Sequence, residues 1–370
     1  MPCAEPGSST GGFDAAQQCW LLLKLNVRQQ VSGMTDQTQS STASAAKARI
    51  PVAVLTAADE SLPPGLEEIQ DSAELVHARD ADSLRGALRK AQVLLVTDFR
   101  TRLLEQYWSE AQEISWVHAT SAGVDAMLFP ALRDSDIPLT NAKGIFDRPI
   151  AEFVLGQILA FAKDMPRSWH LQQQRRWQHR ETERIEGRRV LVVGAGSIGR
   201  QIARLLRAVG MLVQGVARKP RQSDPDFDRV HGQDQLLHVL PDAEFVVLAT
   251  PLTADTRGLI GHEALKAMRR DARLINIARG PVVQTAALLD ALRGGWIAGA
   301  ALDVFEEEPL PSHHPLYSLS NVLLSAHMAG DVIGWREALS AQFIDNFRRW
   351  QRGEPLANQV DKQLGYVASS

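Results

Sequence analysis

Short apolar runs alternate with amphipathic segments along the chain from residue 50 onward. Each run is about as long as a typical strand, whereas the segments between runs place their apolar residues at helical spacing. Strands and helices that alternate in this way predict a parallel sheet covered on both faces. In the first unit the predicted strands are 52–55, 73–78, 93–97, 116–119 and 137–141, and the predicted helices are 83–91 and 101–108.

A second α/β unit begins near residue 189. An apolar helix over 150–162 precedes it, and because its apolar residues lie almost all round, we expect it to be buried between the two units. The polar and basic segment 170–179 is predicted to be a solvated surface helix. The predicted strands of the second unit are 190–193, 211–217, 244–250, 272–278, 297–304 and 322–325, with helices over 262–269 and 285–293.

The last predicted helix has one face that is too apolar for solvent. We therefore expect the tail to cross back and cover the first unit, which makes that domain discontinuous. The predicted fold class is α/β, with two Rossmann-like or flavodoxin-like doubly wound parallel-sheet domains separated by a cleft. The apolar face consists of Trp335, Leu339, Phe343, Phe347 and Trp350. The predicted divisions are 1–48 as a disordered N-terminal extension, 49–142 with 331–365 as the substrate-binding (catalytic) domain, and 143–330 as the dinucleotide-binding Rossmann domain with its linking helix.

Composition and charge exclude several classes of function. The 370 residues carry 40 Lys and Arg against 43 Asp and Glu, a net charge of −3, so no global field recruits nucleic acid or an anionic membrane. No apolar run reaches the roughly 18 residues that a membrane span needs. Cys3 and Cys19 both precede the first predicted strand, which excludes a cysteine nucleophile, a disulfide framework and a thiolate metal site within the fold and fits a cytoplasmic location. Met34 is an alternative start, in which case residues 1–33 are a translated upstream segment.

The segment 189–199 predicts a dinucleotide site. A buried strand ends at Gly194, and Gly194, Gly196 and Gly199 then form a G-x-G-x-x-G turn before an amphipathic helix. In such a unit the first glycine makes the tight turn, the second lets a pyrophosphate approach the backbone, and the third lets helix and strand pack closely. An ordinary glycine turn is the alternative, but the strand before and the helix after favour the dinucleotide site.

The end of the next strand indicates which dinucleotide is bound. NAD sites usually end this strand with Asp or Glu, which accepts hydrogen bonds from the adenosine ribose hydroxyls. Here the sequence reads Ala217-Arg218-Lys219-Pro220-Arg221 and offers no carboxylate. Because guanidinium groups attract a 2′-phosphate that an acid would repel, we predict NADP(H) as the preferred cofactor and NAD(H) as the second choice. A solvated basic turn is the alternative interpretation.

Four features follow predicted strands at the edge where the two units face each other. They are Ala122-Gly123, Arg279, the acidic segment 303–308 and His327. The N–H groups of Ala122-Gly123 and the Arg279 guanidinium suit a substrate carboxylate, and His327 can supply the proton that a carbonyl oxygen needs when hydride arrives at carbon. A neighbouring carboxylate favours the imidazolium form, so we predict Arg279, Glu308 and His327 as the catalytic residues.

Each of these residues also has a structural interpretation. Arg279 could complement a phosphate or a surface acid, His327 could be a hydrogen-bonded histidine at a strand end, and the acidic turn could be solvated. His313 and His314 lack a spaced set of further ligands, so no metal site is predicted.

Together these residues resemble the D-isomer-specific 2-hydroxyacid dehydrogenase family over about residues 50–360. The matching segments are Ser121–Asp125, the glycine turn, Thr250–Thr253, Asn276–Gly280, Asp303–Leu310 and Ser325–His327. The resemblance implies the catalytic roles given above, an Asp303 that orients the nicotinamide carboxamide, phosphate contacts from Ser197 and Ile198, and a homodimer formed around the cofactor domain. Ala122, Gly123 and Arg279 are the predicted substrate-binding residues. The predicted cofactor-binding residues are Gly194, Gly196, Ser197, Ile198, Gly199, Arg218, Lys219, Arg221, Thr250, Pro251, Ile277, Ala278, Asp303, His327 and Gly330.

Two departures from the family pattern bear on function. Ala326 stands where the family often has proline before the histidine, which puts the rigidity of that loop in question. The missing acid after the second cofactor strand supports NADP(H), and Arg218 and Lys219 resemble members that reduce glyoxylate or hydroxypyruvate with NADPH. Loops around Phe99, residues 144–146 and Trp335 are expected to line the side-chain end of the substrate.

The predicted function is therefore NADP(H)-dependent reduction of a small 2-oxo acid to its D-2-hydroxy acid. A dinucleotide-sensing corepressor or scaffold is the alternative from another class, because family members of that kind keep the same site. A hydride-assisted hydrolase on the same fold is a third interpretation.

Overall fold

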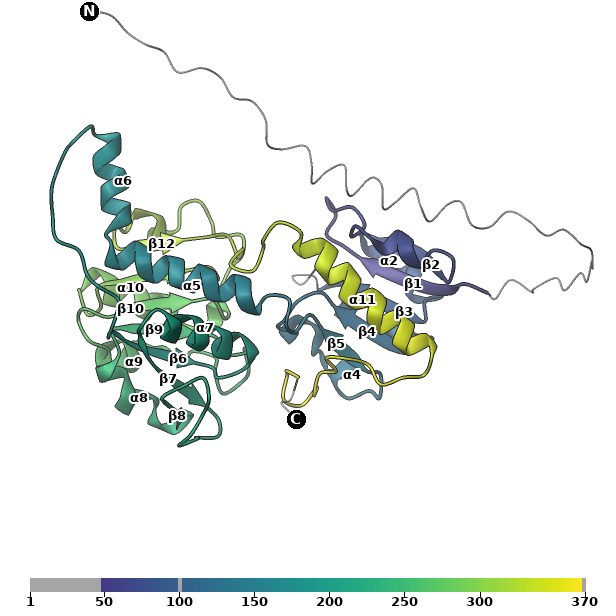
Figure 1. Cartoon of the computed structure of the whole chain (residues 1–370). Coiled ribbons are helices and arrows are strands. Elements are labelled where there is room, and N and C mark those ends of the chain that lie inside the picture. The colour runs from purple at the N-terminus through teal and green to yellow at the C-terminus, as the bar shows by residue number, and fades with distance from the viewer. Residues whose placement is uncertain (1–47, 99–101, 368–370) are drawn as a thin grey trace, which may run out of the picture. The chain divides into compact units, whose positions relative to one another are not determined.

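The computed structural model describes residues 48–98 and 102–367, which are built around two parallel β-sheets (Figure 1). Residues 1–47 of the predicted extension 1–48 lie outside the described residues, and so does Phe99. The predictions of disorder, of an alternative start at Met34 and of two cysteines outside the fold therefore concern a part of the chain that the structure does not describe.

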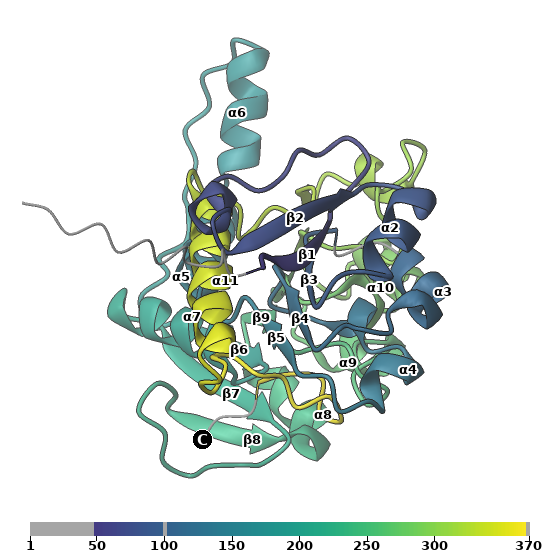
Figure 2. The ribbon, with the colours of Figure 1, turned by 90° about the vertical axis from the view of Figure 1, so that its right-hand side faces the viewer.

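The first sheet has short helices on one face and one long helix from the C-terminal part of the chain on the other (Figures 1 and 2). Its strands run in the order β2-β1-β3-β4-β5, and every pairing is parallel. The elements are β1 (Ile50–Leu55), β2 (Ala73–Ala78), β3 (Val93–Val96), β4 (Trp116–Ala119), β5 (Leu139–Asn141), α2 (Ala81–Leu88), α3 (Leu103–Tyr107), α4 (Pro130–Arg133) and α11 (Trp335–Gln351). Because side chains alternate along a strand, Ala53 and Leu55 pack in the cluster under α2, whereas Val52 and Val54 pack in the cluster under α11.

The second sheet is longer and is also covered on both faces. Its strand order is β12-β11-β10-β9-β6-β7-β8, again with parallel pairing throughout. The elements are β6 (Arg189–Val193), β7 (Leu212–Ala217), β8 (Arg229–Gly232), β9 (Phe245–Leu248), β10 (Arg273–Asn276), β11 (Gly299–Leu302), β12 (Val322–Leu324), α5 (Asp147–Ala162), α6 (Met165–Gln173), α7 (Ser197–Ala208), α8 (Leu236–Val239), α9 (His262–Ala267) and α10 (Thr285–Arg293). Val190 and Val192 pack with α5 and α7, and Leu191 and Val193 pack with α8, α9 and α10. This arrangement confirms the predicted fold class.

The tail returns to the first sheet as the apolar face of the last helix predicts. Leu339, Phe343 and Phe347 of α11 are buried, and the Phe343 ring stacks on Trp116 of β4 with centroids 5.3 Å apart. Trp335 differs from the rest of that face, because it lies beside Phe146, with ring centroids 6.3 Å apart, in the wall of a cleft. The domain division 49–142 with 331–365 and 143–330 stays a prediction.

Several elements differ from the sequence prediction, among them α6, β8 and α8. The surface helix predicted over 170–179 is α6, which begins at Met165, where Pro166 suits the first turn, and ends at Gln173. β8 was not predicted because its residues Arg229–Gly232 include a single large apolar residue, Val230, and carry no readable alternation. The short helix α8 was missed as well, since it is barely one turn long.

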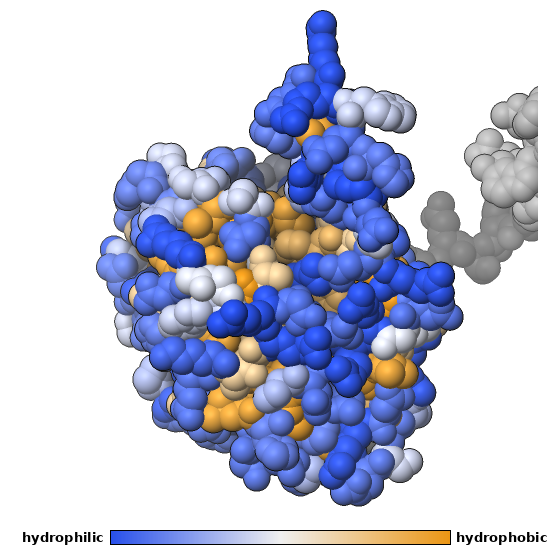
Figure 3. Space-filling view, turned by 90° about the vertical axis from the view of Figure 1, so that its left-hand side faces the viewer, coloured by the Kyte–Doolittle hydropathy of each residue, from blue (hydrophilic) through white to orange (hydrophobic). Residues whose placement is uncertain are grey.

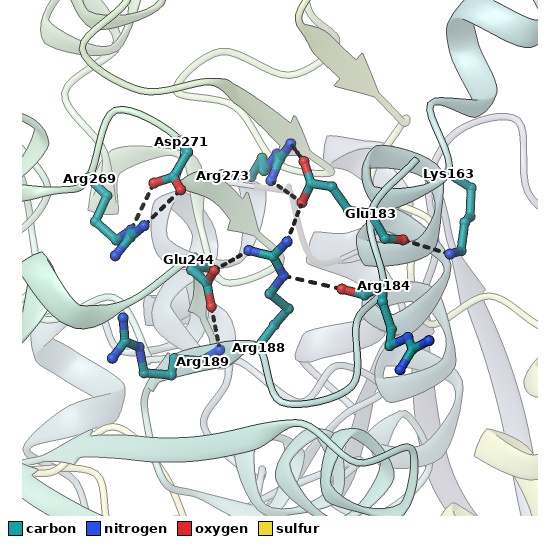
Figure 4. A network of polar contacts seen from close by, with 9 residues as sticks. All are labelled: Lys163, Glu183, Arg184, Arg188, Arg189, Glu244, Arg269, Asp271 and Arg273. Atoms are coloured by element: carbon teal, nitrogen blue, oxygen red, sulfur yellow. Dashed lines mark hydrogen bonds and ion pairs between the residues drawn. The ribbon is translucent and has the colours of Figure 1, made fainter. Parts of the chain in front are cut away.

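An ionic network joins the segment after α6 to the amino-terminal ends of β6, β9 and β10 (Figure 4). The Glu183 carboxylate accepts hydrogen bonds from both terminal nitrogens of Arg273, at 3.0 and 2.5 Å, and forms an ion pair with Arg188 at 3.8 Å. The buried Glu244 carboxylate accepts hydrogen bonds from the Arg188 guanidinium and from the Arg189 N–H, the latter at 2.9 Å. Burial alone would raise the pKa of Glu244, but these hydrogen bonds outweigh it and lower the pKa below the ordinary value.

We expect Glu244→Gln to destabilise the protein by about 1–3 kcal/mol at pH 7, because buried donors lose an ionised acceptor. The folded-state pKa of Glu244 is lowered, so its contribution is present above the unfolded-state pKa and is lost as the pH falls through the folded-state pKa. The difference in free energy of unfolding between wild type and variant should therefore shrink on acidification. Urea unfolding at several pH values measures it. Glu354→Gln, which breaks an exposed pair with Arg352, is the control and should change little; a pH-independent difference for Glu244→Gln would contradict the ionic explanation.

Candidate active site

A cleft of about 1100 Å³ lies between the carboxyl ends of the two sheets. Both sheets belong to one compact unit of the chain. In open parallel sheets this edge is where ligands bind, and the volume is large enough for a dinucleotide with a small acid. Every predicted cofactor- or substrate-binding residue except Gly199 lines this cleft, and Gly199 is buried beneath the turn. The residues that line it are Ala122, Gly123, Gly194, Gly196, Ser197, Ile198, Arg218, Lys219, Arg221, Thr250, Pro251, Ile277, Ala278, Arg279, Asp303, His327 and Gly330.

The glycine turn has the geometry that a pyrophosphate needs. Gly194 has φ +113°, and a Cβ there would lie 2.4 Å from the Ala249 carbonyl oxygen. A Cβ at Gly199 would lie 1.8 Å from the Gly194 carbonyl oxygen, so only glycine lets α7 start this close to β6. A Cβ at Gly196 would meet no protein atom within 4 Å, which means that the space beside this residue is open. The N–H groups of the first turn of α7 therefore have room for phosphate oxygens.

The basic residues after β7 also fit a phosphorylated ribose. The end of β7 carries no carboxylate, and Arg218, Lys219 and Arg221 all line the cleft. Arg221 donates one hydrogen bond from Nε to Asp224, at 2.8 Å, while its Nη2 is buried without a hydrogen-bond partner among the described residues. A buried donor without an acceptor is costly, and an additional anion would satisfy it.

Arg279 follows β10 and reaches the loop after β4. Its Nε donates to Asp125 at 3.0 Å, and its Nη1 donates to the Ala278 carbonyl at 2.8 Å. A Cβ at Gly123 would lie only 2.1 Å from Nη2 of Arg279, so the guanidinium rests against a position that only glycine leaves open. Gly280 makes a comparable approach to the backbone of Phe305, where a Cβ would lie 1.9 Å from the carbonyl carbon. These contacts bring together Arg279 and Ala122-Gly123, as the sequence predicts.

His327 and Glu308 form the predicted pair. His327 Nδ1 and Glu308 Oε2 are 2.7 Å apart, and a second Glu308 oxygen accepts the Phe305 N–H at 2.9 Å. Burial alone would raise the pKa of Glu308, but the hydrogen bonds from His327 and Phe305 and the nearby charges of His327 and Arg279 lower it. An ionised carboxylate only accepts hydrogen bonds, so we infer that Nδ1 carries a proton and that Nε2 is the atom suited to exchange one with a ligand.

The loop that carries His327 is held by Asp303. The His327 backbone is left-handed, with φ 52°, which is uncommon for a residue other than glycine. Its N–H donates to the Asp303 carbonyl at 2.8 Å. The buried Asp303 carboxylate accepts from Ser325 Oγ at 2.6 Å and from the N–H groups of Met328 and Ala329, each at 3.0 Å. These bonds fix the loop although Ala326 stands in place of a proline.

Several cleft residues escaped the sequence prediction. Asp125 lies within a segment that the resemblance singled out, but only the structure pairs it with Arg279. Asp147, at the start of α5, hydrogen-bonds Ser197 of the glycine turn, and burial raises its pKa. Burial also raises the pKa of Asp331, which follows the His327 loop. Neither aspartate belongs to a sequence motif, so no local signal could have found them.

Two further observations concern metal ions and membranes. Among the residues that the structure describes, no three or more His, Cys, Asp or Glu side chains are grouped so as to hold a metal ion, and His314 instead accepts a hydrogen bond from the Leu316 N–H at 3.3 Å. Within residues 48–98 and 102–367, every helix is too short or too polar to cross a bilayer.

Comparisons with known proteins agree with this geometry. A family model described as D-isomer specific 2-hydroxyacid dehydrogenase, NAD binding domain, matches residues 155–329. The glyoxylate reductase of Thermococcus kodakarensis is 31% identical over 312 residues, which cover 81% of this chain and 89% of the relative.

Solved structures give the same result over most of the chain. A D-isomer specific 2-hydroxyacid dehydrogenase from Xanthobacter autotrophicus Py2, in complex with NADPH and MES, is 34% identical with a TM-score of 0.74 and covers 86% of this chain and 100% of that one. An NADPH-dependent glyoxylate/hydroxypyruvate reductase from Sinorhizobium meliloti, in complex with NADP and sulfate, is 27% identical with a TM-score of 0.76 and the same coverage. The chain therefore belongs to the D-isomer-specific 2-hydroxyacid dehydrogenase family, whose members are oxidoreductases that use a nicotinamide dinucleotide.

Proposed function

We propose that the protein reduces a small 2-oxo acid of the glyoxylate or hydroxypyruvate kind to the D-2-hydroxy acid with NADP(H). The observation that carries the proposal is that Arg279 lies against Gly123 and that His327, which is paired with Glu308, lines the same cleft as the glycine turn. An anion anchor, a proton donor and a dinucleotide cradle are the three parts that this reduction requires.

Each side chain has one role in the reaction. NADPH supplies the hydride when it is bound in the cleft. Arg279 holds the substrate carboxylate through charge-assisted hydrogen bonds, and Asp125 and the Ala278 carbonyl keep its guanidinium in place. His327 as imidazolium gives the Nε2 proton to the carbonyl oxygen as the carbon accepts hydride, and the Glu308 carboxylate stabilises the charged ring before transfer. Reversal of the same steps oxidises the hydroxy acid.

The cofactor is NADP(H), with NAD(H) as the weaker alternative. Arg218, Lys219 and Arg221 stand where NAD sites carry an acid, and the buried Nη2 of Arg221 lacks an acceptor within the described residues. The two solved relatives named above are described with NADPH or NADP, which supports the assignment.

The proposed substrate class is supported by the names of two relatives and by two aromatic side chains in the cleft wall. Two of the relatives are named for the reduction of glyoxylate, one of them also for hydroxypyruvate. Phe146 and Trp335 lie beside each other in the wall, in keeping with the proposal that they line the side-chain end of the substrate. A corepressor or scaffold would keep the same cleft, so only turnover separates it from a reductase. On cysteine usage we place the protein in the cytoplasm.

We also propose a homodimer that involves α6. This helix projects from the second sheet and its neighbours (Figure 1), and it carries Trp169, which is 66% exposed. Trp177, in the segment that follows, is fully exposed, and large exposed aromatic residues are typical of interfaces. Figure 3 shows further apolar side chains gathered on the same face below α6.

The catalytic assignment is tested with His327→Asn, because asparagine tolerates the left-handed backbone that this position requires. We expect kcat to fall by roughly 10²–10⁴, the usual loss on removing a general acid, while NADPH binding persists. The measurement is steady-state oxidation of NADPH and NADH with glyoxylate, hydroxypyruvate, pyruvate and phenylpyruvate.

His262→Asn is the matched control, since it removes another histidine–carboxylate pair, 3.1 Å from Asp290 and outside the cleft. Full turnover by His327→Asn would exclude the acid/base role. Absence of turnover by the wild type despite NADPH binding would favour a sensing or scaffold function.

The approach of Arg279 to Gly123 gives a second test. In Gly123→Ala the new methyl group would displace the end of a flexible side chain, so the fold should survive while the anion anchor moves. We expect the KM for the 2-oxo acid to rise by about tenfold or more, with an unchanged unfolding temperature. Gly86→Ala on α2, where a Cβ meets no atom within 4 Å, serves as the control. Kinetics of Gly123→Ala equal to those of the control would contradict the placement of Arg279.

The dimer is tested by sedimentation of a Trp169→Glu, Trp177→Glu double variant. Two buried and unpaired carboxylates would oppose association, so the sedimenting mass should fall from that of two chains to that of one. Leu237→Glu, which charges an apolar residue of α8 that is 41% exposed, should leave the mass unchanged. A wild type that sediments as one chain would refute the proposal.

A further inference from the structure

The last described residues of the chain reach the cofactor cleft. After α11 the chain runs antiparallel to β5, where the Val360 N–H donates to Leu139 at 2.8 Å. The Lys362 ammonium then donates to the carbonyls of Leu132, at 3.0 Å, and Ile137, at 2.9 Å. These bonds attach the tail firmly to the first sheet and its neighbours.

A closed turn follows and presents Tyr366. The Asp361 N–H donates to the Tyr366 carbonyl at 3.1 Å, and the Gly365 N–H donates back to Asp361 at 2.8 Å. The Asp361 side chain accepts from the N–H groups of Gln363 and Leu364, each at 3.0 Å. Tyr366 is thus part of an ordered turn, and it lines the same cleft as the glycine turn.

Tyr366 contacts Arg218, which follows β7 on the other sheet. The Arg218 guanidinium carbon lies 5.2 Å from the centre of the Tyr366 ring, and Nη2 donates a hydrogen bond to the phenolic oxygen. A guanidinium over an aromatic face is attracted by the ring electrons. An exposed arginine samples many rotamers, so this contact restricts Arg218 to the conformation that faces the cleft.

Arg218 differs from the neighbouring arginines in its charge partners. Arg200 is bound to both Asp224 and Asp226, Arg204 to Asp226, and Arg221 to Asp224. Arg218, in contrast, has no carboxylate within ion-pair distance among the described residues, and the phenol takes up one of its five N–H donors. Its charge and remaining donors are therefore available to a phosphate.

We propose that Tyr366 is a positioning residue that holds Arg218 for the 2′-phosphate of NADP(H). The selectivity for the phosphorylated cofactor then depends on a residue of the C-terminal tail, carried by the first sheet, and not only on the strand that precedes Arg218. This inference rests on the proposed preference for NADP(H).

The test measures binding without turnover. Adenosine 2′,5′-bisphosphate and ADP are titrated calorimetrically into wild type, Tyr366→Ala, Tyr366→Phe and Arg218→Ala. We expect Tyr366→Ala to weaken the 2′,5′-bisphosphate about five- to tenfold and ADP less than about twofold, with Tyr366→Phe intermediate because the ring remains. In an Arg218→Ala background, Tyr366→Ala should have no further effect.

The remaining outcomes overturn the proposal in distinguishable ways. Equal weakening of both ligands would give Tyr366 a merely structural role, and unchanged or tighter binding of the 2′,5′-bisphosphate would show that Tyr366 does not assist Arg218. A wild type that binds ADP as well as the 2′,5′-bisphosphate would instead refute the NADP(H) preference itself. Tyr317→Ala, which removes a tyrosine that is 56% exposed and lies outside the cleft, is the control and should leave both affinities unchanged.

Discussion

The position of the imidazole depends on one buried carboxylate. Asp303 lies at the end of β11. Its carboxylate oxygens accept three hydrogen bonds from the loop after β12, and its backbone carbonyl accepts a fourth from the His327 N–H. A left-handed backbone at a residue other than glycine costs about 1–3 kcal/mol, so His327 holds this conformation only because these bonds outweigh the cost. The loop therefore owes its shape to hydrogen bonds.

The same carboxylate reconciles two requirements of the site. The imidazole must stay oriented toward Glu308, 2.7 Å away, and must also remain at the cleft surface where a ligand arrives. A buried anchor that binds the backbone of the loop meets both requirements. Two glycines help to place Arg279: Gly123 leaves room for its guanidinium, and Gly280 lets the chain after it approach the backbone of Phe305.

The sequence contains enough to predict the fold and to propose the catalytic residues, but not to predict the contacts between distant loops. Arg279 and His327 could be found because each directly follows a strand, and the carboxyl ends of parallel strands share one edge. Asp125 and Tyr366 could not be assigned, because their partners lie far away in the chain and the pairing depends on how two sheets pack. β8 was missed for a related reason, since edge strands are decided by tertiary packing and carry little local pattern.

The return of α11 has a consequence for biosynthesis. Val52, Val54 and Trp116 form one face of the first sheet, yet Phe343 and Phe347, which cover this face, leave the ribosome only after the whole second sheet. The second sheet is encoded without interruption from β6 to β12, so it can fold while the first still exposes apolar side chains. The first sheet is thus completed after the second, and in the nascent chain its uncovered face is a site at which aggregation can begin.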